Sequence, residues 1–103
     1  MSNKLEHGVQ SSVTATHATA AVATKDAVAG QTHVAVAVSC SSDKATSILL
    51  IKDGTTVIWQ QQVGATFCNL SFPGGLKATT GALLSAEIDG TAACKANLSV
   101  ITV

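Results

Sequence analysis

The three histidines, His7, His17 and His33, are the side chains that could act as a base near neutral pH. A nucleophilic site needs such a base within reach of a Ser, Cys or Thr, and a third group to orient it. His7 lies in a polar stretch without periodicity, and His33 begins an alternating segment. The Gly-x-Ser-x-Gly elbow is absent. We therefore expect no enzyme, and we interpret His7 and His33 as surface or interface residues.

The three cysteines, Cys40, Cys68 and Cys94, are widely spaced and form no Cys-x-x-Cys pair. We expect all three to be buried and to pack as small apolar side chains. A zinc site that combines cysteines with His17 or His33 is one alternative, although metal-ligand spacing is missing. One disulfide with a leftover thiol is the other. We expect no metal and no cofactor.

The acidic residues suggest turns rather than chemistry. Glu87 and Asp89 share one face of an expected strand, the nearest approach to the paired carboxylates of glycoside hydrolysis. Calcium at Asp43 and Asp89 would lack the usual Asp-x-Asp spacing. Asp-Gly and Pro-Gly-Gly segments are typical turn sequences, and they lack the Gly-Lys-Ser/Thr of a phosphate loop. Structural turns are expected at Asp53, Gly54, Pro73, Gly74, Gly75, Asp89 and Gly90.

Composition excludes several function classes. The 103 residues fit one domain, and six basic residues, all Lys, balance six acidic ones. A chain with zero net charge and no Arg is unsuited to nucleic acid, which requires clustered positive charge. Tyr is absent and aromatic residues total 3%, which leaves few platforms for stacking.

Charged residues make up only 12% of the chain, against about 25% in ordinary soluble domains. The surface is therefore either neutral and rich in hydroxyl groups, or covered by other subunits. A homo-oligomer, dimer or trimer, is expected. The uncharged amides of Gln60, Gln61 and Gln62 are candidate interface residues, together with His7 and His33.

Targeting signals are not evident. No apolar segment follows Lys4, as a signal peptide would require, and no apolar run approaches 18 residues. We expect synthesis in the cytoplasm and no membrane partner.

Alternation of side chains predicts strands over most of the chain. Residues 1–11 lack a core pattern and are interpreted as a flexible or partner-docked arm, followed by a sandwich domain over residues 12–103. Residues 12–29 could be extended or a short Ala-rich helix. The fold class expected is all-β, a single antiparallel β-sandwich or jelly-roll-like domain of about seven or eight strands. The expected core residues are Val34, Val36, Val38, Leu50, Val57, Trp59, Leu84, Ile88, Leu98 and Val100.

Three segments together resemble small β-sandwich proteins of phage and prophage virions. They are the stretch from Ala29 to Ser42 with its Gly-x-x-His start, the Asp-Gly hairpin within 49–59, and Phe-Pro-Gly-Gly before the last hairpin. The resemblance implies a capsid decoration (cement) or accessory protein that binds the major capsid protein, stabilises the particle and resides in the virion. It brings no catalytic residues. An adhesion or carbohydrate-binding sandwich on a phage tail fibre or cell surface is the alternative, with Trp59 and Asn69 as its candidate contacts.

Overall fold

Residues 8–103 are described by the computed structural model, and every regular element among them is a strand. The eight strands are β1 (Val9–His17), β2 (Ala20–Lys25), β3 (His33–Ser42), β4 (Ile48–Asp53), β5 (Thr56–Gln62), β6 (Phe67–Lys77), β7 (Leu84–Asp89) and β8 (Cys94–Thr102). The expected all-β fold is confirmed. The segment 12–29, left open between helix and extended chain, is extended: it contains the rest of β1 and all of β2, with no helix. Within the described range there is no helix of the length and hydropathy needed to cross a bilayer.

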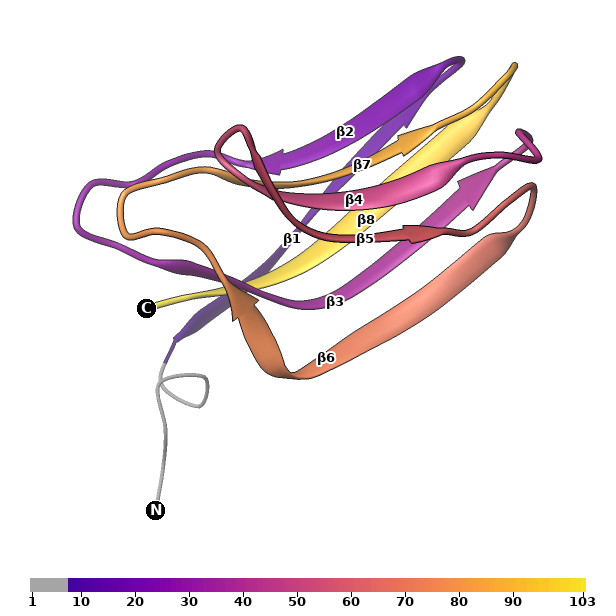
Figure 1. The fold of residues 1–103 in the computed structure, drawn as a ribbon. Coiled ribbons are helices and arrows are strands. Elements are labelled where there is room, and N and C mark those ends of the chain that lie inside the picture. The colour runs from indigo at the N-terminus through magenta and orange to yellow at the C-terminus, as the bar shows by residue number, and fades with distance from the viewer. Residues whose placement is uncertain (1–7) are drawn as a thin grey trace.

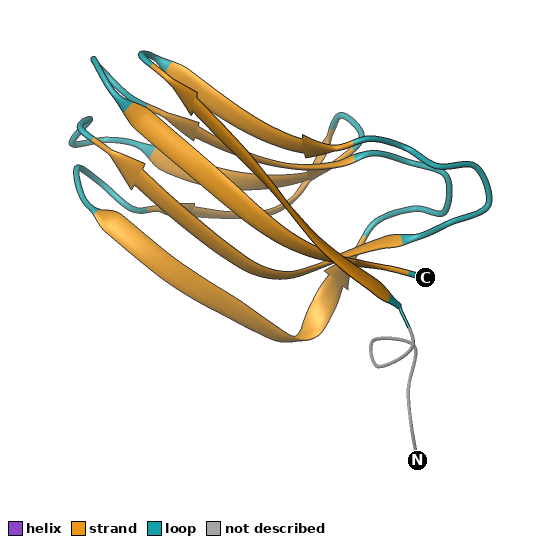
Figure 2. Ribbon diagram, turned by 180° about the vertical axis from the view of Figure 1, so that it is seen from behind, coloured by secondary structure: helices purple, strands orange, loops and turns teal. Residues whose placement is uncertain are grey.

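Two four-stranded antiparallel sheets pack face to face (Figure 1). One, sheet A, has the order β1-β8-β3-β6, and the other, sheet B, has the order β2-β7-β4-β5. The chain folds back on itself at the β4–β5 turn as one long antiparallel hairpin, which is then rolled into the two sheets. This hairpin pairs β1 with β8, β2 with β7, β3 with β6 and β4 with β5. That arrangement is a jelly roll. Figure 2 shows the same two layers from behind.

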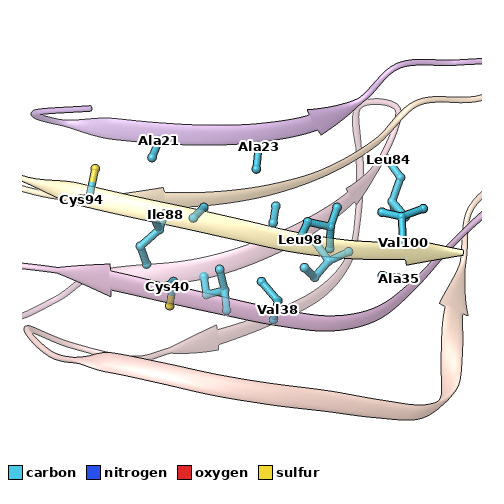
Figure 3. Packing of buried hydrophobic residues seen from close by; sticks show 14 of the residues in the cluster. Ala21, Ala23, Ala35, Val38, Cys40, Leu84, Ile88, Cys94, Leu98 and Val100 are labelled. Carbon is cyan, nitrogen blue, oxygen red and sulfur yellow. The ribbon is translucent and has the colours of Figure 1, made fainter. Parts of the chain in front are cut away.

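The core lies between the sheets, where the inward side chains of β3 and β8 meet those of β4 and β7. Figure 3 shows Val38, Ile88, Leu98 and Val100 in this layer. Side chains of a strand point alternately to its two faces, so every second residue contributes. Of the expected core residues, six are buried: Val34, Val38, Leu84, Ile88, Leu98 and Val100.

Val36 does not follow the alternation expected for it. Against β8, the register of β3 shifts between Ala35 and Ala37, which pair with the adjacent residues Val100 and Ser99, so Val36 is the extra residue of a β-bulge. A bulge leaves one residue unpaired and changes which residues point inward. Ala35 therefore faces the core before the bulge and Val38 after it, while Val36 is only half-buried.

Leu50 and Val57 are the other two corrections to the expected core. Leu49 and Ile51 are fully buried, so Leu50 points to the outer face of sheet B and is half-buried. Val57 is 42% exposed. A second register shift, between Ile51 and Lys52 of β4, makes Ile58 the extra residue of β5. Val57 consequently lies on the outer side although it is two residues from Trp59.

The expected turn between β4 and β5 is present, with a different geometry. Asp53 pairs with Thr56, and only Gly54 has a positive φ, of 62°. A two-residue loop with positive φ at its first position is type II′, whereas a type I′ turn, the form that the Asp-Gly pair predicts, needs it at both. The Asp53 carboxylate instead accepts hydrogen bonds from the Thr79 backbone N–H and hydroxyl group.

Pro73, Gly74 and Gly75 do not end a strand, as the sequence predicted; they form a corner inside β6. Leu76 pairs with Ala35 and Ser71 with Ala37, so the intervening residues loop out at this corner. A Cβ on Gly75 would lie 2.3 Å from the Val34 Cγ1 atom, so only glycine lets β6 pass so close. Proline is tolerated because β6 is an edge strand.

The sheet begins earlier than the sequence suggested. β1 starts at Val9, where it pairs with Thr102, so residues 9–11 belong to sheet A rather than to an arm. The remainder of the expected arm, residues 1–7 with His7, lies outside the described residues.

Candidate binding surfaces

His33, expected at the surface or in an interface, is fully buried. Its Nε2 atom lies 2.8 Å from the Asp26 carbonyl oxygen, and its Nδ1 atom lies 2.8 Å from the Thr102 hydroxyl oxygen. Because the carbonyl can only accept, Nε2 carries a proton and donates to it; in the neutral imidazole Nδ1 then accepts from the hydroxyl group of Thr102. His33 thus fastens the loop before β3 to the C-terminal strand, and the interface role expected for it is wrong.

The loops at one end of the sandwich are held by carboxylates. The Asp43 carboxylate accepts hydrogen bonds from the backbone N–H groups of Thr91, Ala92 and Ala93, at 2.7, 2.8 and 3.2 Å. These bonds, the one from Thr91 foremost, lower the pKa of Asp43. Asp89 binds the Lys44 ammonium at 2.8 Å, and this contact lowers the Asp89 pKa. Both carboxylates therefore hold the fold together.

His17 and Cys94 border an open cleft at the same end, together with residues 41–43 and 92–95. The Nδ1 atom of His17 accepts hydrogen bonds from the backbone N–H groups of Thr19 and Ala20, and the Cys94 thiol donates to the His17 carbonyl oxygen. Each group thus has a structural partner. Within residues 8–103 no three His, Cys, Asp or Glu side chains gather in the way a metal ion would need.

The open side of the sandwich is the first candidate surface; we define it as edge strands β5 and β6 with the loop between them. Gln60, Gln61 and Gln62, the candidate interface residues, are exposed there. Trp59 and Phe72 bridge the two sheets beneath, with ring centroids 5.3 Å apart in an edge-to-face contact. Trp59 is half-buried and packs against the core. Phe67, at the start of β6, is 76% exposed.

The outer face of sheet A is the second candidate surface. Strand register places Thr14, Asn97, Ser39 and Asn69 side by side across all four strands. These are neutral donors and acceptors, and the Thr14 hydroxyl group is 3.2 Å from the Asn97 amide oxygen. Together with Lys95 and Phe67 they line a shallow hollow of about 270 Å³. We call this site the amide hollow.

The sequence identified only Asn69 among the amide-hollow residues. The residues of the hollow are far apart in the sequence, Thr14 and Asn97 by 83 residues, so only the pairing of β1, β8, β3 and β6 brings them together. The sequence carried part of the information needed to find this site: Phe67, Asn69 and Ser71 share one face of an expected strand, and Asn97 and Ser99 share one face of another expected strand. Trp59, the other expected sugar contact, lies on the inner side of β5 and does not reach this hollow.

Comparison with known proteins gave only remote likenesses. No protein-family model and no curated protein matches the chain. Among solved structures, the periplasmic g-type lysozyme inhibitor PliG of Aeromonas hydrophila is 11% identical, with 95% of this chain and 90% of that chain covered and a TM-score of 0.45. The carbohydrate-binding module TmCBM61, solved with β-1,4-galactotriose, is 14% identical over 93% and 69% of the two chains, with a TM-score of 0.43. The insecticidal delta-endotoxin Cry8Ea1 of Bacillus thuringiensis is 10% identical, with coverages of 98% and 21% and a TM-score of 0.47.

Proposed function

We propose that this protein is a non-enzymatic structural module that acts within an assembly, as a capsid decoration protein does, and that its open side pairs with a second copy. The observation that carries the proposal is the lack of charge on that side. From Gly54 through Leu76, across β5, the following loop and most of β6, no residue is Asp, Glu, Lys or Arg.

Edge strands normally carry protection against pairing. A free edge presents unpaired N–H and C=O groups, and natural proteins block it with charged side chains, above all Lys, or with Pro. β5 is bonded to β4 on one side, and the other side has no strand partner within residues 8–103. It carries three glutamines and the exposed Val57 in place of a charge. An unprotected edge beside exposed apolar side chains favours antiparallel pairing with a second copy.

The opposite edge of sheet B serves as an internal comparison. β2 is also an edge strand and exposes Val22 to 43%, about as much as Val57. It ends at Lys25, and β1 of the other sheet lies beside it (Figure 1). We therefore assign the pairing to β5 rather than β2.

Oligomeric state tests this assignment. Val57→Lys places a charge on the β5 edge and should convert the oligomer to a monomer in light scattering coupled to size exclusion. Val22→Lys, a matched change on the β2 edge, should leave the oligomer intact. A wild-type protein that is monomeric at micromolar concentration, or loss of the oligomer in Val22→Lys only, would contradict the proposed interface.

The virion role needs its own experiment. Mass spectrometry of purified particles should find this chain in numbers comparable to the coat protein, because a cement protein covers a repeated surface. Its absence from particles, or its presence in a few copies only, would exclude the decoration role. Jelly rolls occur among both viral capsid and lectin domains, so the fold is compatible with this role and with the alternative below.

The amide hollow favours a second candidate, carbohydrate binding. Asn69, Asn97 and Ser39 offer uncharged donors and acceptors, which suit sugar hydroxyl groups, and the exposed ring of Phe67 borders them. An Asn69→Ala variant should lose binding on a glycan array that the wild type retains, while Ser12→Ala, farther along the same face, should not. A wild-type protein that binds no glycan on the array would remove this candidate.

A further inference from the structure

The thiols of Cys40 and Cys68 meet across two paired strands. Cys40 of β3 is the direct register partner of Cys68 of β6, and their Sγ atoms are 3.1 Å apart. Directly opposed residues of antiparallel strands have Cα atoms about 4.5–5.5 Å apart, within the range that a disulfide spans. We propose that Cys40 and Cys68 form a cross-strand disulfide when the protein meets a small-molecule disulfide oxidant, and that this bond locks edge strand β6 onto sheet A.

The same register argues against the other pairings. Cys94 stands opposite Ser42, so Cys40 is its diagonal neighbour rather than its partner. Diagonal Cα atoms are about 7–8 Å apart, at or beyond the limit for a disulfide without backbone movement. The Cys94 thiol also donates a hydrogen bond to the His17 carbonyl oxygen at 3.2 Å. Cys94 is therefore the leftover thiol.

The order of the chemical steps follows from exposure. Cys40 is buried, and this burial, together with the neighbouring Cys68 side chain, raises the pKa of Cys40 to about 12. Cys68 is the more exposed thiol and lies on an edge strand, so it reacts first. Its thiolate, after loss of a proton, attacks one sulfur of oxidised glutathione; the oxidant's S–S bond breaks and one glutathione thiolate leaves.

The second step closes the bridge. Cys40 loses its proton and attacks the Cys68 sulfur of the mixed disulfide, which releases the second glutathione thiolate. The two protein thiols are thus oxidised by two electrons, and one oxidised glutathione is reduced to two thiols. The two released protons go to the two leaving thiolates.

The bond would act on the strand that carries both candidate surfaces. Cys68 lies between Phe67 and Asn69, whose side chains project from the opposite face of β6 into the amide hollow. β6 has β3 as its partner on one side and forms part of the open side on the other. A covalent link to β3 therefore fixes the position of these two residues and resists fraying of the edge.

Thiol counting tests the bond itself. The full chain is reduced, incubated with oxidised glutathione, unfolded, and alkylated with iodoacetamide before mass spectrometry. Before oxidation the wild type should carry three alkyl groups and afterwards one, on Cys94, with a peptide that links Cys40 to Cys68. The matched control Cys94→Ala should go from two alkyl groups to none. Three alkylated cysteines after oxidation, a bridge that includes Cys94, or a glutathione adduct on Cys68 that never closes would overturn the proposal.

Thermal unfolding tests the locking effect. Cys40 and Cys68 are 28 residues apart, and a closed loop of this length corresponds to a rise of roughly 15–20 °C in the unfolding midpoint on oxidation, in the wild type and in Cys94→Ala. Cys68→Ser and Cys68→Ala should show no such rise; two replacements of different polarity separate loss of the bond from local damage to β6. Hydrogen exchange should slow at the backbone amides of β6 in the oxidised protein. An oxidised wild type with the same midpoint and the same β6 exchange as the reduced protein would refute the locking role, even if the bond forms.

Discussion

Replacing His33 with Phe tests whether a buried hydrogen-bonded imidazole holds this fold together. Phe keeps the flat ring and most of its volume, but it offers no partner to the Asp26 carbonyl or to the Thr102 hydroxyl group. A buried polar atom left without a partner costs about 1–3 kcal/mol. Water can reach the Asp26 side of the contact because Asp26 itself is exposed. We therefore expect the lower half of the combined range, a loss of about 2–4 kcal/mol of unfolding free energy.

Urea titration followed by fluorescence measures this loss, since Trp59 is the only tryptophan and packs on Phe72 between the sheets. In heat, an unfolding entropy of about 2.1 cal/mol/K per residue converts the loss to a drop of roughly 10–20 °C in the midpoint. Thr102→Val removes only one partner and should cost about 1 kcal/mol.

His17→Phe is the matched control, because His17 is exposed and its imidazole bonds only the adjacent turn. It should cost less than about 1 kcal/mol, since solvent can replace its bonds. A His33→Phe protein within about 0.5 kcal/mol of the wild type would show that the two hydrogen bonds contribute nothing net. A loss equal to that of His17→Phe would lead to the same conclusion.

Three further tests concern the inward and outward faces, the β6 corner and the loop that Asp43 holds. Leu98→Ala should lower the unfolding free energy in urea by about 2–5 kcal/mol, because Leu98 is fully buried. Val57→Ala, on the outer side, should lower it by less than about 1 kcal/mol. Equal losses would contradict the outward position of Val57 that the β5 bulge produces. Gly75→Ala should cost about 1–3 kcal/mol more than Gly30→Ala, since both glycines have φ of +76° but only Gly75 lacks room for a Cβ; equal losses would contradict the close approach of β6. Asp43→Asn should make the free energy of unfolding fall less steeply as the pH is lowered. Because the pKa of Asp43 is lowered in the folded protein, its stabilising contribution is present above the unfolded pKa of 3.8 and is lost as pH falls through the folded pKa. Unfolding followed by circular dichroism from pH 5 to about pH 2 measures how stability changes with pH.

The sequence predicted the class of fold because alternation is a local property. Val38 and Cys40, Leu84 and Ala86, and Leu98 and Val100 each show it within one strand, and the structure buries all six. What the sequence could not predict were the two bulges. Val36 and Ile58 are β-branched residues inside alternating runs, and nothing in their type distinguishes an extra residue from a paired one. Each bulge shifts the inward set by one residue, as Val57 illustrates.

Long-range contacts explain the remaining errors. His33 looked like an exposed residue at the start of a strand, yet its partner Thr102 is 69 residues away. The row of Thr14, Asn97, Ser39 and Asn69 likewise exists only after four strands align. A polar residue in an alternating strand is assigned to solvent by default, and only the tertiary fold shows whether it is buried with a partner or joined to others on a face.

The scarcity of charge takes on a physical meaning once the charged residues are located. Asp43, Asp53 and Asp89 accept hydrogen bonds from backbone N–H groups of other segments, and Glu87 pairs with Lys52 at 3.3 Å. These acidic groups thus bind loops and strands of the same chain, so few negative charges remain to create an electrostatic field around the protein. A surface of this kind has little electrostatic steering to offer a partner. Pairing at the proposed open-side interface, or sugar binding in the amide hollow, would therefore depend on backbone hydrogen bonds, shape and neutral side-chain hydrogen bonds rather than on long-range charge attraction.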